Sequence, residues 1–437
     1  MFRRLAFWLL LFLVFTVPWE YLYRVDDMTM VSRAVGVVVA GAWALAALAA
    51  GRLRRPGSLL VLMALFVAWC LASIVWSVDS ELSIRQAITY LQLLMLAVIL
   101  WDLVQTEREL RLTLQAYVLG SWVVVARLVE TYLTGDVMRR FTVGEFNQNT
   151  LGLVLALALP MAWYLASSAR ARRAAGESDL TLYLSLPNLA FIPSALFAIF
   201  LTSSRAALLG GLLGLGYMAL SLRHARWGWR LAAVGAAAVI AVYGWRFIPE
   251  QSLDRYSSTT TELSEGDWNG RLPIWEEGLR MIEDNWLVGV GARAFVTGAV
   301  QTGNAPHNLV ISMLAELGLI GFGLFAAILG TAAALALRQP GTAAMWLTLL
   351  VVWFLNAITH NYEDKKVTWM LFMLIAIGAA LRQTQSQRQP APALHRAAAP
   401  APAPAPAPAL ALASAEPELP HDARPIARTS AALSRST

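Results

Sequence analysis

A series of apolar runs, each about 20 residues long, constrains the fold of this chain more than any other feature of its sequence. An α-helix needs a run of that length to cross the hydrocarbon core of a bilayer. Within lipid, only helices and closed barrels pair all of their backbone polar groups, and these runs lack the alternation of apolar and polar residues that barrel strands need. The runs therefore predict an all-α polytopic membrane protein.

The composition agrees with this class. Hydrophobic residues make up 58% of the 437 residues and charged residues only 14%, whereas a soluble domain carries about a quarter. The one cysteine, Cys70, lies inside an apolar run, so an intrachain disulfide is excluded and no metal site is indicated. The five histidines are scattered and show no metal-ligand spacing. No small-residue cleavage site follows the first run, which is therefore interpreted as an uncleaved first span.

We expect about twelve transmembrane helices and a disordered tail. Residues 1–382 form the expected transmembrane domain. Residues 383–437 contain an alternating Ala-Pro run and are expected to be a disordered cytoplasmic tail. The spans are expected at 5–20, 34–51, 58–76, 84–104, 111–133, 150–167, 184–202, 205–222, 229–248, 307–337, 342–360 and 367–382.

The charges in the short loops indicate which way the spans run. Compact arginine clusters, such as those at 52–55 and 170–173, lie in loops on the same side as the N-terminus. Short loops rich in arginine and lysine stay in the cytoplasm, which places both termini there. The large loop 249–306, between the ninth and tenth spans, is then outside, where acidic residues are more common.

Arginine is nevertheless frequent on the expected outer side. A guanidinium can hold phosphate with two parallel hydrogen bonds, which the point charge of lysine does not do. Arg205 is the most constrained, because Ser203 and Ser204 leave almost no loop between two spans and keep the charge at the membrane boundary. For any single residue, compositional bias or snorkelling at a helix end is the simpler explanation. Arg127, for example, can instead pair with Glu130 on the same helix.

The outer loop is expected to contain an amphipathic helix. Ile274, Gly278 and Ile282 recur at helical spacing after Pro273, while charged residues occupy the other faces. Such a helix lies on a membrane surface or folds over the spans as a lid. The run 288–291 predicts a turn, because it lacks the strand and the Lys-Ser/Thr ending of a phosphate-binding loop.

The tenth run, 307–337, is longer than a membrane requires. As a straight helix it would measure roughly 45 Å, at about 1.5 Å per residue, against a hydrocarbon core of about 30 Å. Gly318, Gly321 and Gly323 offer a bend or a close helix contact. We therefore expect its first turns to project above the outer surface or to enter the membrane obliquely.

His307, at the start of this run, is the main candidate for acid–base chemistry. With Asn304 as the helix cap, His307 would stand in the first turn, at the positive end of the helix dipole. That position disfavours the imidazolium and leaves a neutral ring that can accept a proton. The alternative is a polar helix-start residue without a chemical role. Glu316 is about half a helix turn out of phase and is not expected to share the face of His307.

The chain resembles the O-antigen ligase family, within a wider group that includes O-antigen polymerases and membrane O-oligosaccharyltransferases. The pattern that carries the resemblance is a histidine and an asparagine, nine residues, a glycine, two residues and a second glycine. Here these positions are His307, Asn308, Gly318 and Gly321. The resemblance covers roughly residues 80–380 and is supported by Ser203-Ser204-Arg205, by Gly270-Arg271 with Trp275, and by the segment 285–291.

The resemblance implies a GT-C-like glycosyltransferase of the bacterial inner membrane, with its active site facing the periplasm. The implied reaction moves O-antigen polysaccharide from undecaprenyl diphosphate to the lipid A–core oligosaccharide, without a metal or other cofactor and without a nucleic-acid partner. His307 would be the general base, and Arg205 and Arg271 would contact the diphosphate. Supporting roles would fall to Asn308, Arg127, Arg140, Arg280 and Trp275.

Three alternatives remain open. An O-antigen polymerase uses the same donor with a lipid-linked acceptor, and its outer loops often carry an arginine, ten residues and a glycine. Arg205 with Gly216 and Arg280 with Gly291 share this spacing. A protein O-oligosaccharyltransferase usually has a further periplasmic region at its C-terminus, which the Ala-Pro tail does not match. A transporter would show internal symmetry and buried charges along a path through the bilayer, whereas the polar residues here gather at one face.

Overall fold

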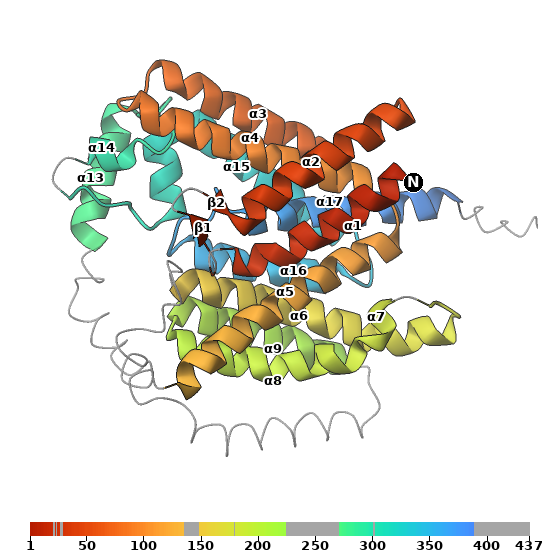
Figure 1. The fold of residues 1–437 in the computed structure, drawn as a ribbon. Helices are drawn as coiled ribbons and strands as arrows, with labels where there is room; N and C mark the ends of the chain where they lie inside the picture. The colour runs from red at the N-terminus through yellow and green to blue at the C-terminus, as the bar shows by residue number, and fades with distance from the viewer. Residues whose placement is uncertain are drawn as a thin grey trace, which may run out of the picture. The chain divides into compact units, whose positions relative to one another are not determined.

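The described part of the chain up to Arg388 folds into a bundle made mostly of long helices (Figure 1). The structure is a computed structural model, and it describes residues 1–134 except 21, 23, 27 and 28, residues 148–223 except 179, residues 271–299 and residues 302–388. Two short strands, β1 Arg24–Asp26 and β2 Thr29–Met30, pair antiparallel. The helices are α1 Phe2–Thr16, α2 Val31–Ala50, α3 Ser58–Ala72, α4 Ser80–Leu103, α5 Glu107–Leu133, α6 Gln148–Ala174, α7 Leu180–Tyr183, α8 Ser185–Thr202, α9 Arg205–Leu222, α13 Arg271–Asp284, α14 Phe295–Gly298, α15 Leu309–Leu337, α16 Ala343–Ala357 and α17 Lys366–Arg388, with short 3₁₀ turns at Val17–Trp19 and Ser73–Val75.

These helices confirm the all-helical, multi-pass class. Ten of the helices that the structure describes are long and apolar enough to cross a membrane, and α16 is a shorter apolar helix. Helices α1–α6, α8, α9 and α15–α17 each coincide with an expected span, although α17 continues beyond residue 382 to Arg388. The expected ninth span at 229–248, the loop residues 249–270, Arg140 and the tail from residue 389 onward lie outside the described residues.

Polar side chains at helix starts explain where several helices begin. Asp79 accepts a hydrogen bond from the backbone N–H of Leu82 and caps α4. Thr106 and Glu109 form a reciprocal capping box at the start of α5. Ser204 caps α9 through the N–H of Ala207, directly after α8 ends. Each cap satisfies backbone donors that the first turn of a helix leaves unpaired.

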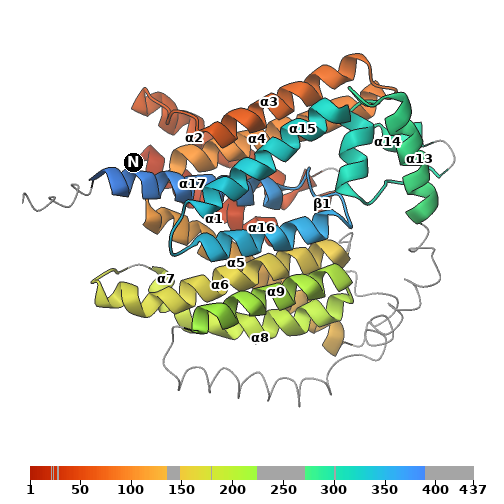
Figure 2. The ribbon, with the colours of Figure 1, turned by 180° about the vertical axis from the view of Figure 1, so that it is seen from behind.

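Helix α6 is the buried centre of one half of the bundle, with α8 and α9 side by side against it (Figures 1 and 2). Every residue from Leu151 to Ala162 is buried. The helices approach closely because of glycine: a Cβ on Gly152 would lie only 2.2 Å from the Cβ of Ala207 on α9. This packing fixes the start of α9 against the start of α6.

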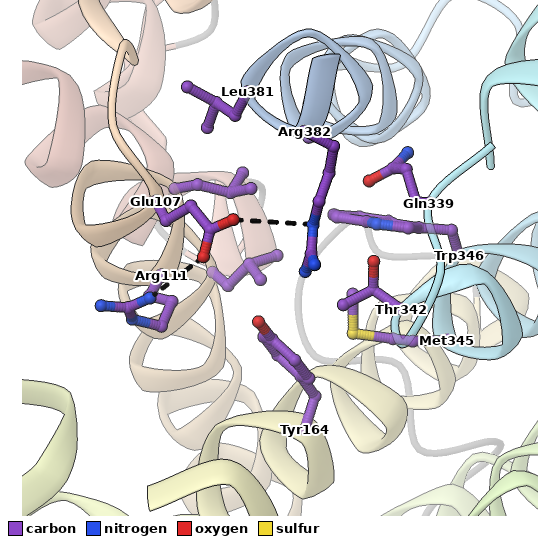
Figure 3. A pocket seen from close by; sticks show the side chains of 12 residues that line it. Glu107, Arg111, Tyr164, Gln339, Thr342, Met345, Trp346, Leu381 and Arg382 are labelled. Carbon is purple, nitrogen blue, oxygen red and sulfur yellow. Dashed lines mark ion pairs between the residues drawn. The ribbon is translucent and has the colours of Figure 1, made fainter. Parts of the chain in front are cut away.

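The two ends of the bundle carry different polar groups. At one end, which we call the basic end, the loops 51–57, 104–106 and 338–342 meet the N-terminus and the last turns of α17. Glu107 lies there between Arg111 and Arg382, at 3.6 and 3.5 Å (Figure 3). The opposite end, which we call the site end, comprises the described residues of 73–79, 203–204, 271–308 and 358–365.

Helix α15 is broken at Gly318, and this break organises the site end. Gly318 has φ 65° and ψ −169°, a conformation that is essentially restricted to glycine. A break leaves backbone N–H and C=O groups on both sides without helical partners. These groups bond instead to the turn 285–291 and to a tryptophan of α3: Val290 N to Ala315 O (2.9 Å), Gly291 N to Glu316 O (2.9 Å), Trp69 Nε1 to Leu317 O (3.0 Å), Leu319 N to Trp286 O (2.8 Å) and Ile320 N to Leu287 O (3.3 Å).

The turn and the break lie so close together that no side chain fits between them. A Cβ on Gly318 would lie 2.3 Å from the carbonyl of Leu287, and a Cβ on Gly289 would lie 2.4 Å from the carbonyl of Glu316. A Cβ on Gly321 would lie 3.1 Å from Cδ1 of Trp69 on α3. The expected bend is therefore confirmed at Gly318, and the expected close contact at Gly321.

The amphipathic helix expected in the outer loop is α13, and it packs on the first half of α15 (Figure 2). The contact is close, since a Cβ on Gly278 would lie 2.6 Å from Cγ2 of Ile311. A small core separate from the main core fills this interface. Its buried members are Ile274, Met281, Val290, Ala294, Phe295, Ala299 and Ala315. The described part of the loop is thus fixed to the half of α15 that begins after His307.

A substitution at Gly318 tests the account of the break. We expect Gly318→Ala to destabilise the protein by about 3 kcal/mol or more, because alanine meets both an unfavourable backbone conformation and the carbonyl of Leu287. Thermal unfolding of the purified protein in detergent measures this. Gly323→Ala is the matched control, since nothing lies within 4 Å of its Cβ. Equal unfolding temperatures for the two variants would contradict the account.

Candidate active site

His307 lies just before α15 and not in its first turn. The N-cap of the helix is Asn308, whose Oδ1 accepts from the backbone N–H groups of Val310 (3.0 Å) and Ile311 (3.3 Å). The expectation that Asn304 caps the helix and that His307 is inside it is wrong, because the amide of Asn308 supplies the cap. Asn308 therefore fixes the backbone on one side of the histidine.

The backbone of His307 is in the left-handed region, with φ 46°. For a residue with a side chain, such a conformation costs about 1–3 kcal/mol and persists only where the surroundings impose it. On the preceding side, Trp275 Nε1 donates to the carbonyl of Pro306 at 2.9 Å. On the following side stands the cap at Asn308. The position of the imidazole is thus set by α13 and by the start of α15.

The imidazole of His307 pairs with a second histidine, His360. Their Nδ1 atoms are 3.1 Å apart, and the rings are almost parallel, with centroids 4.7 Å apart and an interplanar angle of 5°. His360 was not among the predicted site residues, because it lies 53 residues from His307 along the chain. The available signal was the polar run 359–366 between two apolar runs, which is long for a loop that only joins two spans.

His360 is held in place by its own segment. Asn361 donates from Nδ2 to Ser312 Oγ at 2.8 Å, which ties the segment 358–365 to the first turns of α15. The ring of Tyr362 contacts that of His360 at a centroid distance of 5.3 Å. Tyr362 is fully buried, so it anchors this part of the segment in the core.

Partial burial favours the neutral form of both imidazoles. Burial lowers the pKa of His307 below its usual value, and the positive charge of Arg271 lowers it further. Burial, followed by His307, Lys365 and Arg271, lowers the pKa of His360 to about 4, while Asp364 opposes this shift. The lowered pKa of His307 agrees in direction with the expectation, but burial and a nearby guanidinium cause it.

Helix α13 brings one of its two arginines to the histidines. Arg271, at the start of the described helix, is half-buried and acts electrostatically on both rings. Arg280 is exposed, on a face of α13 that does not pack on α15. Trp275 holds the loop at Pro306 through its indole N–H. Of the residues expected in this helix, Arg271 and Trp275 therefore approach His307.

Arg205 is the first residue of α9, at the same end of the bundle. Its neighbour Ser204 caps the helix and donates from Oγ to Asn149 Oδ1 at 2.7 Å. Asn356, near the end of α16, donates to the carbonyl of Ala206 at 3.4 Å. His360 follows shortly after α16, so the start of α9 and the histidine pair lie on the same side of the bundle.

The remaining arginines are placed differently. Arg127 forms an ion pair with Glu130 at 2.5 Å on the same helix, as the alternative interpretation of this residue predicted. Arg140 lies outside the described residues. Glu316 accepts from the backbone N–H of Arg293 at 2.8 Å and so belongs to the contact between the break and the turn, apart from His307. Among the residues that the structure describes, no group of three or more His, Cys, Asp or Glu is arranged to hold a metal ion.

Comparison with known sequences finds a family model that matches the central part of the chain. Residues 189–326 match the family model described as Wzy_C, O-antigen ligase. This match confirms the resemblance over fewer than half of the residues, and the matched segment contains Arg205, Arg271 and His307. No curated protein matches the chain.

Comparison with solved structures gives a weak likeness. One chain, from the structure titled "Structural coordination of polymerization and crosslinking by a peptidoglycan synthase complex", is 18% identical, with a TM-score of 0.35, over 74% of this chain and 97% of that chain. A likeness at this level carries no argument about fold or function.

The electrostatic contact between Arg271 and His307 can be tested by titration. We expect His307 to titrate below the usual pKa of about 6.5, and Arg271→Ala to raise its pKa because one positive charge is removed. Histidine NMR on the labelled protein in detergent, with the signal assigned by a His307 substitution, measures both values. Arg280→Ala, on the exposed face of the same helix, is the control and should leave the pKa unchanged. A larger change in the pKa of His307 with Arg280→Ala than with Arg271→Ala would refute the proposed electrostatic effect of Arg271.

Proposed function

We propose that this chain is an O-antigen ligase, which transfers O-antigen polysaccharide from undecaprenyl diphosphate to the lipid A–core oligosaccharide. One observation carries the proposal: half-buried His307 follows Pro306, which Trp275 of α13 holds, and Arg271 of the same helix places its positive charge near the imidazole. His307 and Arg271 lie in the segment that matches the family. This is the pair of groups that a transfer from a sugar diphosphate requires, a base for the acceptor and a cation for the leaving group.

In the proposed mechanism, His307 removes the proton from a hydroxyl of the acceptor sugar. The hydroxyl oxygen attacks the anomeric carbon of the glycan, and the bond from that carbon to the diphosphate breaks. General-base catalysis contributes about 10²- to 10⁴-fold to such a step. Arg271 and Arg205 would stabilise the negative charge that grows on the diphosphate, which is most effective where water is excluded. Planar guanidinium groups suit this role because they hold phosphate through two parallel hydrogen bonds.

The proposed location is the bacterial inner membrane, with the site end in the periplasm. The arginines of the basic end support this orientation, because short basic loops stay in the cytoplasm. Both termini would then be cytoplasmic, and the loop 249–306 would be periplasmic between the ninth and tenth of about twelve spans, in a GT-C-like arrangement. Membrane lipid and a groove between spans would accommodate the undecaprenyl chain.

The spacing that suggested a polymerase does not form a second site among the described residues. Arg280 is on the exposed face of α13, while Gly291 lies in the turn, where its Cβ would be 2.2 Å from Ser77 Oγ. Gly216 lies inside α9, three turns from Arg205. Neither arginine–glycine pair is a local unit, so we give the ligase precedence over the polymerase.

Substitution of His307 tests the proposed base. We expect His307→Gln to lower kcat by about 10²- to 10⁴-fold, because glutamine keeps a polar side chain but does not take up a proton at neutral pH. The assay is transfer of labelled glycan in proteoliposomes that contain both lipid substrates. Donor binding and detergent stability, measured in parallel, separate lost chemistry from lost folding. Transfer at the wild-type rate would remove the base assignment.

Arg205 can be tested by a change that keeps its charge. We expect Arg205→Lys to lose most of the transfer activity, since an ammonium group does not reproduce a bidentate contact to phosphate. Arg223→Lys is the matched control, because Arg223 stands at the opposite end of the same helix. The same proteoliposome assay measures both variants. Full activity in Arg205→Lys would show that only the charge matters at this position.

A further inference from the structure

His360 has no role in the resemblance, yet its Nδ1 lies 3.1 Å from the Nδ1 of His307. The contact is held from both sides. Asn308 and Trp275 fix the backbone around His307, and Asn361 ties the segment of His360 to α15. A hydrogen bond between two anchored rings couples their tautomers, because the nitrogen that donates carries a proton and the nitrogen that accepts does not.

The position of that proton decides whether His307 can act as a base. When both rings are neutral, only one of the two facing Nδ1 atoms carries a hydrogen. If His360 is the donor, the hydrogen of His307 is on Nε2, and no lone pair is free for the acceptor hydroxyl. If His307 is the donor, its Nε2 keeps a free lone pair. Only the second arrangement is compatible with a base at His307.

We propose that His360 is the positioning residue of His307: its Nδ1 accepts the Nδ1–H of His307 and so keeps the lone pair of His307 on Nε2. This inference rests on the general-base role in the proposed function. It adds a residue from outside the matched segment 189–326.

The proposed transfer forms one bond to the anomeric carbon and breaks another. Nε2 of His307 takes the proton of the acceptor hydroxyl, and the oxygen of that hydroxyl forms the new bond to the anomeric carbon. The bond from this carbon to the diphosphate oxygen breaks, and its electron pair stays on the diphosphate. His307 is then an imidazolium whose Nδ1–H still bonds to neutral His360. The proton on Nε2 finally passes to the diphosphate or to water.

The charges around the two histidines favour the uptake of only one additional proton by the pair. His360 faces the ring of His307 and the charges of Arg271, Lys365 and Asp364, and two of these are positive. If both rings took up a proton, two imidazolium rings would lie 4.7 Å apart, near the positive charges of Arg271 and Lys365. His360 therefore stays neutral and remains able to accept the hydrogen bond while His307 gains and loses its proton.

Two substitutions separate the hydrogen bond from the ring contact. His360→Phe keeps an aromatic ring against His307 but removes the acceptor, whereas His360→Asn loses the ring but places an amide oxygen near the position of Nδ1. We expect the phenylalanine variant to lower kcat by about 10- to 100-fold, with KM unchanged, which is less than the loss of the base itself. We expect the asparagine variant to retain most of the activity.

The pH profile and a double variant show whether His360 acts through His307. Without the acceptor, the imidazolium of His307 loses a hydrogen bond, so its pKa falls and the acidic limb of kcat/KM moves to lower pH in His360→Phe. In a His307→Ala background, His360→Phe should cause no further loss of activity. An unmoved acidic limb, or an additional loss in the double variant, would overturn the proposal.

The tautomer of His307 can also be observed without any transfer reaction. We expect ¹⁵N NMR of histidine-labelled protein in nanodiscs to show His307 protonated at Nδ1 and bare at Nε2 near pH 7, and His360→Phe to abolish this preference. A proton on Nε2 in the wild-type protein would refute the role of His360. This measurement needs no substrate, so it tests the role of His360 independently of the proposed transferase function. The proposed function is tested separately, and transfer by the His307→Gln variant would contradict it.

Discussion

The backbone pairing between the break in α15 and the turn 285–291 is the interaction on which the site end depends. Four backbone hydrogen bonds to the turn, and a fifth from the indole of Trp69, replace those that the helix gives up around Gly318. The close approach requires glycine on both sides, at Gly318 and Gly289. The spacing between His307 and Gly318 therefore corresponds to the first half of α15. This half begins after the histidine and ends where the helix bonds to the turn 285–291.

This docking explains how distant parts of the chain meet at one histidine. The loop is pinned at the break, so α13 lies on the first half of α15 and directs Arg271 toward His307. The segment 358–365 reaches the same half-helix through Ser312 and brings His360. Partial burial of these groups favours the neutral form of the imidazoles and strengthens the charge interactions among them. The strained backbone at His307 is then a consequence of contacts from α13, from the first half of α15 and from the segment 358–365.

Part of this structure follows from the sequence, because the signals involved are local. The length and polarity of the runs give the helices, and the amphipathic pattern after Pro273 gives α13. The bend at Gly318 was foreseeable, but its docking partner was not, since backbone pairing leaves no trace in side-chain pattern. The helix start was misplaced by a few residues because Asn304 and Asn308 are both good caps, and only packing chooses between them. His360 was missed because its contact with His307 depends on tertiary structure alone.

The most direct test of the account is the identity of the product in a reconstituted reaction. Proteoliposomes containing the purified chain would receive undecaprenyl-diphosphate glycan and purified lipid A–core, and the products would be identified by mass. The account predicts glycan joined to lipid A–core by the wild-type protein, and none by a His307→Gln variant that still binds the donor. Longer lipid-linked glycan, glycan attached to protein, or undiminished transfer by the variant would contradict it.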